Sequence, residues 1–292
     1  MISISGFLLI ISFAFASPLS AQDVIIGGET VYVVQKGDTI DRISSKFGVT
    51  RKSLINENGL DSKKPLTPGR ELRITSRRIV PKNVDGGIVV NIPDRMLYLF
   101  RNGDLSAYPV GLGMPSWRDM TQWRTPEGKF RVVRKQKDPT WHVPESMQWK
   151  MEQEGKPVKR IVPPGPDNPL GRHAVTLSLS GILIHETIWP TSVYRFRSHG
   201  CIRMLREHME TLFEGVDTDM TGEILYKPVK VAVTQEGRIF LEVNADVYGR
   251  VRDMKGEVKR LLNERGVQDK VNWQKVDQLL KDKSGIAEDI TA

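Results

Sequence analysis

The chain has 292 residues, of which 43 are Lys or Arg and 35 are Asp or Glu, so its formal net charge is +8. At about 150 residues per domain, this length corresponds to two domains or to one domain with appendages. A composition of 39% hydrophobic and 27% charged residues is ordinary for globular proteins and excludes a mostly disordered chain. The one long apolar run lies at the N-terminus, which excludes a protein with several membrane-spanning helices. The single cysteine excludes an intramolecular disulfide and a zinc ribbon built on several cysteines.

The first 21 residues have the pattern of a secretory signal peptide. Residues 7–15 form an apolar core that is too short to span a bilayer. Two patterns of small residues typical of a cleavage site follow, one ending at Ala16 and the other at Ala21. Cleavage after Ala21 is favoured because polar sequence begins directly after it. The segment before the core has no Lys or Arg, so an uncleaved N-terminal anchor is the alternative. We expect an exported protein with no transmembrane segment in the mature chain.

Residues 30–75 predict a small β-α-α-β module. Its expected strand, two helices and closing strand occupy residues 30–34, 39–47, 50–56 and 71–74. Ile40, Ile43 and Phe47 recur at helical spacing in the first helix. The basic, polar stretch 75–85 that follows is interpreted as a linker.

Residues 86–228 predict a mainly β domain with one or two helices. The expected strands occupy residues 88–92, 96–100, 107–110, 129–133, 174–179 and 181–185. Asn102-Gly103 is a strong hairpin signal between two of them. Helical periodicity begins only after Cys201, with apolar residues from Met204 to Phe213.

Two further segments lack a clear role. Residues 134–171 form a long polar insertion, and Trp141 and Trp149 within it either cover a cleft or simply pack onto the sheet. Residues 229–292 predict a hairpin and two helices, the second capped by Asn272, as a C-terminal extension that serves as a docking subdomain or partner surface.

The chemistry is concentrated around His185 and Cys201. Cys201 follows Gly200 and is expected to come immediately before a helix, whose N-terminus would favour the thiolate. An imidazole within hydrogen-bond reach would complete a Cys–His pair for acyl transfer, and the N–H groups of Gly200 and Cys201 could bind an oxyanion. Gly200 permits a tight turn at this point. This mechanism requires no cofactor.

Three other interpretations compete with this one. Zinc could bind His185, His199 and Cys201, but their spacing matches no common zinc motif. Cys201 could be merely a buried apolar residue, although a free thiol in an exported protein argues for reactivity. Nucleic-acid binding is disfavoured because the positive charge is spread along the chain.

Residues 30–75 resemble a LysM domain through Tyr32 to Ile40, Phe47-Gly48-Val49, Asn58-Gly59-Leu60 and Leu66 to Leu72. LysM domains bind polymers that contain N-acetylglucosamine, such as peptidoglycan and chitin. The resemblance implies that Gly37-Asp38-Thr39 and the segment 56–60 line a shallow sugar-binding groove. Capping and turn chemistry is the alternative role of Asp38 and Asn56.

The segment 185–203 resembles the catalytic domain of the L,D-transpeptidases of the YkuD type. That family carries a histidine, a spacer, and then Ser/Thr-His-Gly-Cys, a hydrophobic residue and Asn or Arg; here His185 precedes Ser198-His199-Gly200-Cys201-Ile202-Arg203. The order of segments resembles that of the periplasmic enzymes that attach Braun-type lipoprotein to peptidoglycan. Glu186 departs from this subgroup, which usually has Gly there, and this puts the substrate preference near the base in doubt.

The resemblance implies a β-sandwich-like fold, a periplasmic location and a role for each motif residue. Cys201 is the implied nucleophile, which forms a thioester with the diaminopimelate L-centre of a tetrapeptide stem and releases D-Ala. His185 is the implied base, and Arg203 binds a substrate carboxylate unless it forms a surface ion pair in the following helix. Ser198, His199 and Gly200 shape the site and the oxyanion hole.

The resemblance leaves the acyl acceptor open. It is a lipoprotein lysine or another diaminopimelate in a transpeptidase, and water in an L,D-carboxypeptidase or a lipoprotein-releasing hydrolase. The implied partners are peptidoglycan and an outer-membrane lipoprotein, without nucleic acid or metal. A non-catalytic LysM binding protein with a decayed domain is the alternative from another class, and the intact His185 and Ser198–Arg203 motif argues against it.

We predict that the mature protein from the cell envelope begins after Ala21 or Ala16, because the apolar run at 7–15 has the length of a cleaved signal. Intact-mass spectrometry of the envelope protein checks this. Recovery of the chain with Met1 still attached would show an uncleaved anchor instead.

Overall fold

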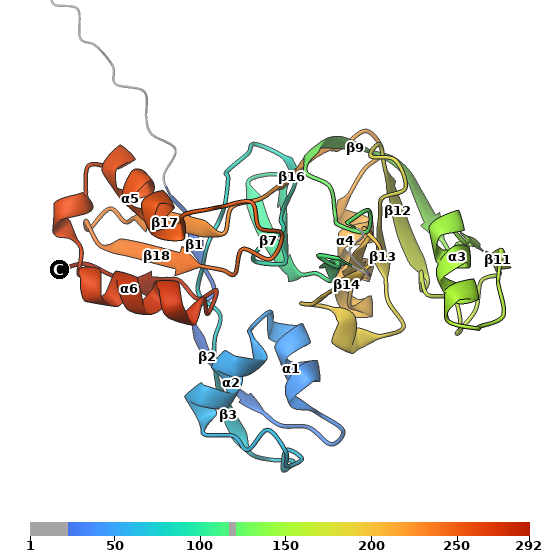
Figure 1. Ribbon diagram of the computed structural model, residues 1–292, viewed down its shortest axis with the longest axis horizontal. Helices are drawn as coiled ribbons and strands as arrows, with labels where there is room; N and C mark the ends of the chain where they lie inside the picture. The colour runs from blue at the N-terminus through green and yellow to red at the C-terminus, as the bar shows by residue number, and fades with distance from the viewer. Residues whose placement is uncertain (1–22, 117–120) are drawn as a thin grey trace, which may run out of the picture.

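The computed structural model describes residues 23–116 and 121–292, and the predicted signal peptide with its cleavage sites lies outside them. Within these ranges the chain forms three bodies: a small module near the N-terminus, a large sheet, and a C-terminal body (Figure 1). No helix in the described part of the chain is both long and apolar enough to cross a membrane.

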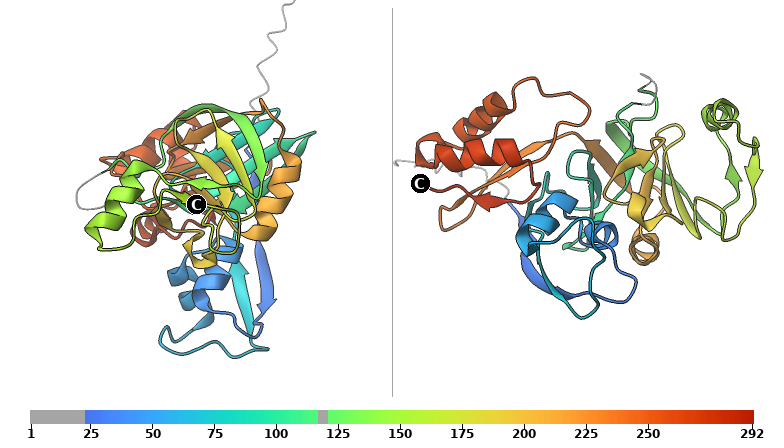
Figure 2. Two further views of the ribbon diagram at one scale, coloured as in Figure 1. Left: turned by 90° about the vertical axis from the view of Figure 1, so that its right-hand side faces the viewer. Right: turned by 60° about the horizontal axis from the view of Figure 1, so that its bottom comes forward.

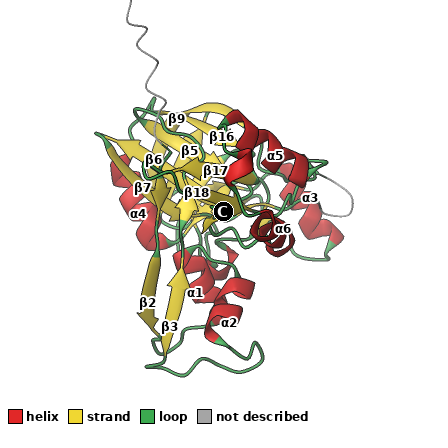
Figure 3. Ribbon diagram, turned by 90° about the vertical axis from the view of Figure 1, so that its left-hand side faces the viewer, coloured by secondary structure: helices red, strands yellow, loops and turns green. Residues whose placement is uncertain are grey.

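The small module folds as its apolar spacing predicts. Its elements are β2 (Glu29–Val33), α1 (Ile40–Phe47), α2 (Arg51–Asn58) and β3 (Glu71–Thr75), and β2 pairs antiparallel with β3. Thr39 and Thr50 cap the two helices through their hydroxyls, and Gly48 and Gly59 end them in the left-handed conformation. The predicted β-α-α-β order is confirmed (Figure 3).

The large sheet has eight strands in the order β15-β13-β12-β9-β16-β5-β6-β7. These strands are β5 (Gly87–Asn91), β6 (Met96–Arg101), β7 (Asp104–Pro109), β9 (Gly128–Lys137), β12 (His173–Leu177), β13 (Leu183–Glu186), β15 (Ile202–Met204) and β16 (Thr221–Leu225). The first half of β9 pairs with β16 and its second half with β12, so this strand joins the two halves of the sheet. The mainly β fold predicted from the sequence is confirmed.

One helix, α4 (Arg206–Gly215), packs against this sheet beside β12, β13 and β6. Its residues Met209, Leu212 and Phe213 are buried in the main core together with apolar residues of the strands. The Asn102-Gly103 turn joins β6 to β7, and both residues have positive φ, as a tight hairpin requires.

The insertion is more ordered than its polar composition predicts. β9 extends to Lys137, and a short pair of strands, β10 (Trp141–His142) and β11 (Ile161–Val162), flanks helix α3 (Glu145–Gln153). In Figure 2 this pair and α3 project from the sheet on the side opposite to the C-terminal body.

The C-terminal body has its own apolar core. Its elements are β17 (Val229–Val233), β18 (Ile239–Val243), α5 (Met254–Glu264), η2 (Gln268–Lys270), α6 (Trp273–Asp282) and β19 (Glu288–Asp289). The predicted hairpin and both helices are present, and Asn272 caps α6 through its side chain. The limits 30–75, 86–228 and 229–292 remain our proposal for the domain boundaries.

The interpretation of residues 75–85 as a polar linker is wrong. This stretch contains β4 (Arg78–Ile79), which pairs with β1 (Ile25–Ile26), and both β4 residues are buried. Arg78 is buried because its guanidinium donates to carbonyl oxygens of Gly48 and Gly285, in the small module and the C-terminal body, and to the Tyr194 hydroxyl. Composition cannot reveal this, because the partners that satisfy the charge lie far away in the sequence.

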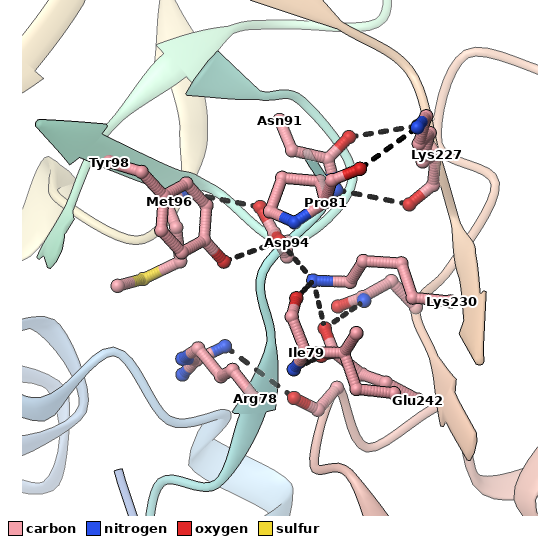
Figure 4. Close-up of polar contacts among 12 residues, drawn as sticks. Arg78, Ile79, Pro81, Asn91, Asp94, Met96, Tyr98, Lys227, Lys230 and Glu242 are labelled. Carbon is pink, nitrogen blue, oxygen red and sulfur yellow. Dashed lines mark hydrogen bonds and ion pairs between the residues drawn. The ribbon is translucent and has the colours of Figure 1, made fainter. Parts of the chain in front are cut away.

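A buried ion cluster lies at the same junction (Figure 4). The Lys230 ammonium, 3% exposed, donates to Asp94 Oδ2 at 2.5 Å, contacts Glu242 Oε1 at 2.8 Å and donates to the Ile79 carbonyl at 2.7 Å. Burial alone would lower the pKa of Lys230, but Asp94 and Glu242 outweigh it and raise the pKa, so the ammonium stays charged. The cluster joins the large sheet, β4 and the C-terminal hairpin.

The small module also contacts the loop that follows strand β13 of the large sheet. Ser45 Oγ donates to the Val193 carbonyl at 2.8 Å, and Arg195 binds Asp41 at 2.7 Å. Helix α1 lies against η1 (Pro190–Ser192), in the loop between β13 and β14 (Phe196–Ser198). The module is therefore packed against the loop that follows His185.

We predict that Lys230→Met lowers the free energy of unfolding by about 3–5 kcal/mol, because Asp94 and Glu242 would remain buried without their cation. Urea unfolding followed by circular dichroism checks this.

The control is Lys255→Met, which removes an exposed lysine paired with Asp277 at 2.6 Å, and its cost should stay within about 1 kcal/mol. Similar costs for the two variants would show that the buried cluster contributes no more than a surface pair.

Candidate active site

His185 lies on the face of β13 that is turned away from the main core. Its neighbour Ile184 is fully buried in that core, and side chains alternate along a strand. His185 is nevertheless only 4% exposed. β13 pairs in parallel with β15, where Ile184 is opposite Ile202 and His185 is opposite Arg203.

The expectation that a helix begins directly after Cys201 is wrong. Cys201 precedes strand β15, and α4 begins only at Arg206. Ile202 and Met204 both enter the core, two residues apart, which is the period of a strand. The helical pattern predicted from Met204 onward therefore starts later than expected.

The strand register places the expected nucleophile and base beside each other on neighbouring strands. In the register, Ile184 of β13 is opposite Ile202 of β15. Cys201 comes one residue before Ile202, and His185 comes one residue after Ile184. The two residues are thus diagonal neighbours across adjacent strands, two register positions apart, which puts them on the same face of the sheet.

The imidazole of His185 has a defined orientation. Its Nδ1 lies 2.6 Å from the Glu186 carbonyl oxygen, which can only accept a hydrogen bond, so we assign the ring proton to Nδ1. Burial, helped by the nearby Arg203 charge, lowers the pKa of His185 to about 4. The ring is therefore neutral at pH 7, and its Nε2 lone pair can act as a base.

The thiol of Cys201 is half-buried, and burial raises its pKa. The Leu183 backbone and the Arg203 charge both favour the thiolate, but they do not outweigh the burial. Sγ donates a weak hydrogen bond to the Gly181 carbonyl at 3.5 Å. Because no helix begins directly after Cys201, no helix N-terminus stabilises the thiolate there. At rest, Cys201 is therefore a neutral thiol and His185 a neutral imidazole.

The turn before Cys201 is held by short hydrogen bonds. Ser198 Oγ donates to the Cys201 carbonyl at 2.5 Å, so Ser198 shapes the turn. Gly200 has a φ of +105°, a conformation that favours glycine, and a Cβ at this position would lie 3.2 Å from a methyl group of Ile182. The tight turn predicted at Gly200 is confirmed.

Two residues that the sequence interpretation missed support this turn. Thr125 Oγ1 donates to the Gly200 carbonyl at 2.9 Å, and the backbone N–H of Thr125 donates to the Tyr248 hydroxyl at 3.1 Å. The same hydroxyl donates to the Gly113 carbonyl at 2.7 Å. Tyr248 lies in the loop after β18, so the C-terminal segment helps to position the turn before Cys201. No local pattern marks either residue.

His199 points toward the insertion. Its ring meets Trp123 edge-on at 4.6 Å between centroids, and its Nε2 lies 3.2 Å from the Lys150 ammonium on α3. The pKa of His199 is lowered to about 4, mainly by burial and also by Lys150 and Arg203. Trp123 is the buried tryptophan at this site, whereas Trp149 is 40% exposed.

Arg203 lies on β15 and not in a helix, so the alternative of an intrahelical ion pair does not apply. Its guanidinium carbon lies 5.6 Å from the centre of the Trp189 ring, and its backbone bridges to Gly111. Trp189, at 49% exposed, is a second aromatic residue of the site that the sequence interpretation missed.

The Glu186 side chain is buried beneath the strand end, 1% exposed. Its carboxylate accepts hydrogen bonds from Arg206 Nε at 2.8 Å and from the Arg172 backbone at 3.1 Å. A Cβ at Gly171 would collide with it at 2.6 Å. This departure from the subgroup pattern is therefore a structural anchor for the strand end whose carbonyl orients His185.

A sequence model of the L,D-transpeptidase catalytic domain (YkuD) matches residues 85–232, which is half of the chain. The chain belongs to this family. A LysM domain model matches residues 32–75. The resemblances at the sequence level are thereby confirmed, and the chain is an L,D-transpeptidase with a LysM domain.

Relatives cover most of the chain. "Probable L,D-transpeptidase YbiS" of Escherichia coli is 27% identical over 266 residues, which are 89% of this chain and 85% of that protein. "Probable L,D-transpeptidase ErfK/SrfK" of Salmonella typhimurium is 27% identical over 293 residues, which are 96% of this chain and 93% of that protein.

Similar solved structures include two bacterial L,D-transpeptidases. A mutant from Enterococcus faecium aligns with a TM-score of 0.36 and 20% identity, over 48% of this chain and 49% of that one. One from Mycobacterium tuberculosis aligns with a TM-score of 0.35 and 15% identity, over 72% of this chain and 96% of that one.

We predict that alkylation of Cys201 by iodoacetamide speeds up as the pH rises, and continues to do so above the ordinary cysteine pKa of about 8.5, because burial raises the pKa of this thiol. Arg203→Gln should slow alkylation at pH 7, because it removes a charge that favours the thiolate. Stopped-flow or mass-spectrometric alkylation rates measure both effects.

Arg203→Lys is the matched control, because it keeps the positive charge and loses the bidentate fork. It should leave alkylation unchanged and lower turnover of a peptide stem. A rate that levels off near pH 7 in the parent enzyme would contradict a raised thiol pKa.

Proposed function

We propose that Cys201 and His185 carry out a two-step acyl transfer on peptidoglycan stems. Sγ of Cys201 attacks the carbonyl carbon at the diaminopimelate L-centre of a tetrapeptide, and His185 Nε2 takes the thiol proton. The bond to D-Ala then breaks, the proton passes to the departing amine, and a thioester remains. In the second step an acceptor amine attacks the thioester, His185 takes its proton, and the sulfur leaves as a thiol.

The observation that carries this proposal is the Nδ1 contact of His185 with the Glu186 carbonyl at 2.6 Å. It leaves Nε2 unprotonated on the residue that is the diagonal neighbour of the thiol. The pKa of His185 near 4 keeps the base unprotonated at neutral pH. A neutral thiol and a neutral imidazole also suit a mechanism in which the thiol proton moves to His185 while Sγ attacks the substrate. In the resting enzyme neither group then carries a buried charge.

Backbone groups of the turn complete the proposed mechanism. The N–H groups of Gly200 and Cys201 are assigned to the oxyanion of the tetrahedral intermediate. The hydrogen bonds of Ser198 and Thr125 to the carbonyls of this turn support the assignment, because they hold its peptide planes in one orientation.

The LysM domain places this chemistry on the polymer. LysM domains bind peptidoglycan, and the family acts on peptidoglycan, so we propose that the exported enzyme works in the periplasm. Because the module packs against the loop after His185, its deletion exposes buried surface and is a poor test of binding alone. The acceptor is proposed to be an amine, from a lipoprotein lysine or a second diaminopimelate.

We predict that Cys201→Ala abolishes release of D-Ala from a tetrapeptide muropeptide, because no second thiol exists in the chain. His185→Ala should slow release by about 10²–10⁴-fold, the usual range for general base catalysis. Liquid chromatography with mass spectrometry of the products measures both.

Three reactions distinguish the acceptors: one with tetrapeptide alone, one with a lysine-ended lipoprotein peptide, and one in ¹⁸O-labelled water. A product that gains only the label would identify a carboxypeptidase or a releasing hydrolase. Undiminished D-Ala release by Cys201→Ala would contradict the thioester mechanism, and binding to sacculi without any turnover would leave only a binding protein.

A further inference from the structure

Helix α3 brings a lysine from the insertion to the catalytic motif. The helix belongs to a segment that projects from the sheet, yet the Lys150 ammonium lies 3.2 Å from His199 Nε2, two residues before the nucleophile in the chain. The Lys150 side chain is only 18% exposed, whereas Lys156 in the same insertion is 66% exposed. Lys150 therefore has lost much of its water at a point beside the active site.

The Lys150 ammonium contacts His199, Trp123 and Glu154. Because His199 is a neutral imidazole at pH 7, its Nε2 can accept a hydrogen bond from the ammonium. The ammonium also lies 5.4 Å from the Trp123 ring centre, within the range of a cation–π contact. The carboxylate of Glu154 is 3.9 Å away and binds Lys156 more closely, at 2.7 Å.

Lys150 and Arg203 form a positive region around the catalytic motif. Burial lowers the pKa of Lys150, and the charges of Lys156 and Arg203 lower it further against the opposing effect of Glu154. Arg203 acts in the same direction on His185 and His199, so its charge reaches every titratable group of the motif. Two partly desolvated cations near each other are stabilised when an anion binds between or beside them.

The proposed donor supplies anions at the required places. Diaminopimelate has two carboxyl groups, and only that of the L-centre becomes the acyl group, so the D-centre carboxylate stays free. The terminal D-Ala carries a second free carboxylate. Two carboxylates thus flank the bond that Cys201 is proposed to break.

We propose that Lys150 is a specificity-determining residue that binds one of these two carboxylates, while Arg203 binds the other. This inference rests on the proposed function and deepens it, because it assigns a recognition role to the insertion. Lys150 provides a point charge and Arg203 a planar fork, so the two sites select for a donor with two acidic groups. A stem with one of them amidated would bind less well.

The test uses the mature enzyme and a synthetic tetrapeptide that ends in diaminopimelate and D-Ala. Lys150→Met should raise KM about 10- to 100-fold, the range expected for one hydrogen bond to a charged group, and change kcat less. Lys150→Arg should restore most of the affinity. Lys156→Met, which also removes a lysine partner of Glu154, is the matched control and should stay within about twofold of the parent enzyme.

Amidated donors identify the carboxylate. One donor carries an amide at the diaminopimelate D-centre and the other ends in D-alaninamide. The parent enzyme should bind less tightly to the amidated donor that lacks the carboxylate which Lys150 binds. The Lys150→Met variant should bind this amidated donor and the unmodified tetrapeptide with the same affinity. The alkylation rate of Cys201 in each variant reports whether the site is intact.

Equal KM changes on all three donors would overturn the inference, because Lys150 would then act only through packing. An unchanged KM in Lys150→Met would overturn it as well. Failure of the proposed function gives a different result, since the parent enzyme would then release no D-Ala from any donor.

Discussion

The arrangement of the large sheet and the C-terminal body depends on the buried cluster of Lys230 with Asp94 and Glu242. The ammonium has three hydrogen-bond donors, and two carboxylates and the Ile79 carbonyl accept them, so this charge is satisfied inside the protein. Each partner comes from a different part of the chain: the β5–β6 turn, β18 and β4 (Figure 4). Because a buried charge without a partner is costly, the three segments are held in one arrangement.

This arrangement makes the C-terminal body a part of the active site. Tyr248 lies in the loop that follows β18. The Tyr248 hydroxyl accepts a hydrogen bond from the Thr125 backbone and donates one to the Gly113 carbonyl, and Thr125 Oγ1 in turn donates to the Gly200 carbonyl in the proposed catalytic turn. On the other side, Arg78 joins the LysM domain to the same junction through the Gly48 carbonyl. The LysM domain and the turn that carries the proposed nucleophile are thus positioned by one packed junction.

Burial and not a helix dipole sets the electrostatics of the proposed catalytic pair. His185 and Cys201 are both held neutral, because desolvation opposes the charged form of each. The surroundings instead provide cations, Arg203 from β15 and Lys150 from the insertion. A site of neutral reacting groups among positive charges suits an acidic donor, whose carboxylates compensate the cations when it binds.

The sequence by itself determined the LysM module, most strands, both C-terminal helices and the family to which the chain belongs. These features depend on local periodicity, helix capping and turn residues such as Asn102-Gly103, which act between near neighbours in the chain. Only the tertiary structure decided that Cys201 precedes a strand, that Arg78 is buried, and that Lys150 and Tyr248 lie at the active site. The physical reason is that burial and ion pairing depend on segments that are distant in sequence. Ile202 and Met204 alternate with the period of a strand because both side chains are buried in the core of the large sheet. Helix α4 begins at Arg206, only two residues after Met204.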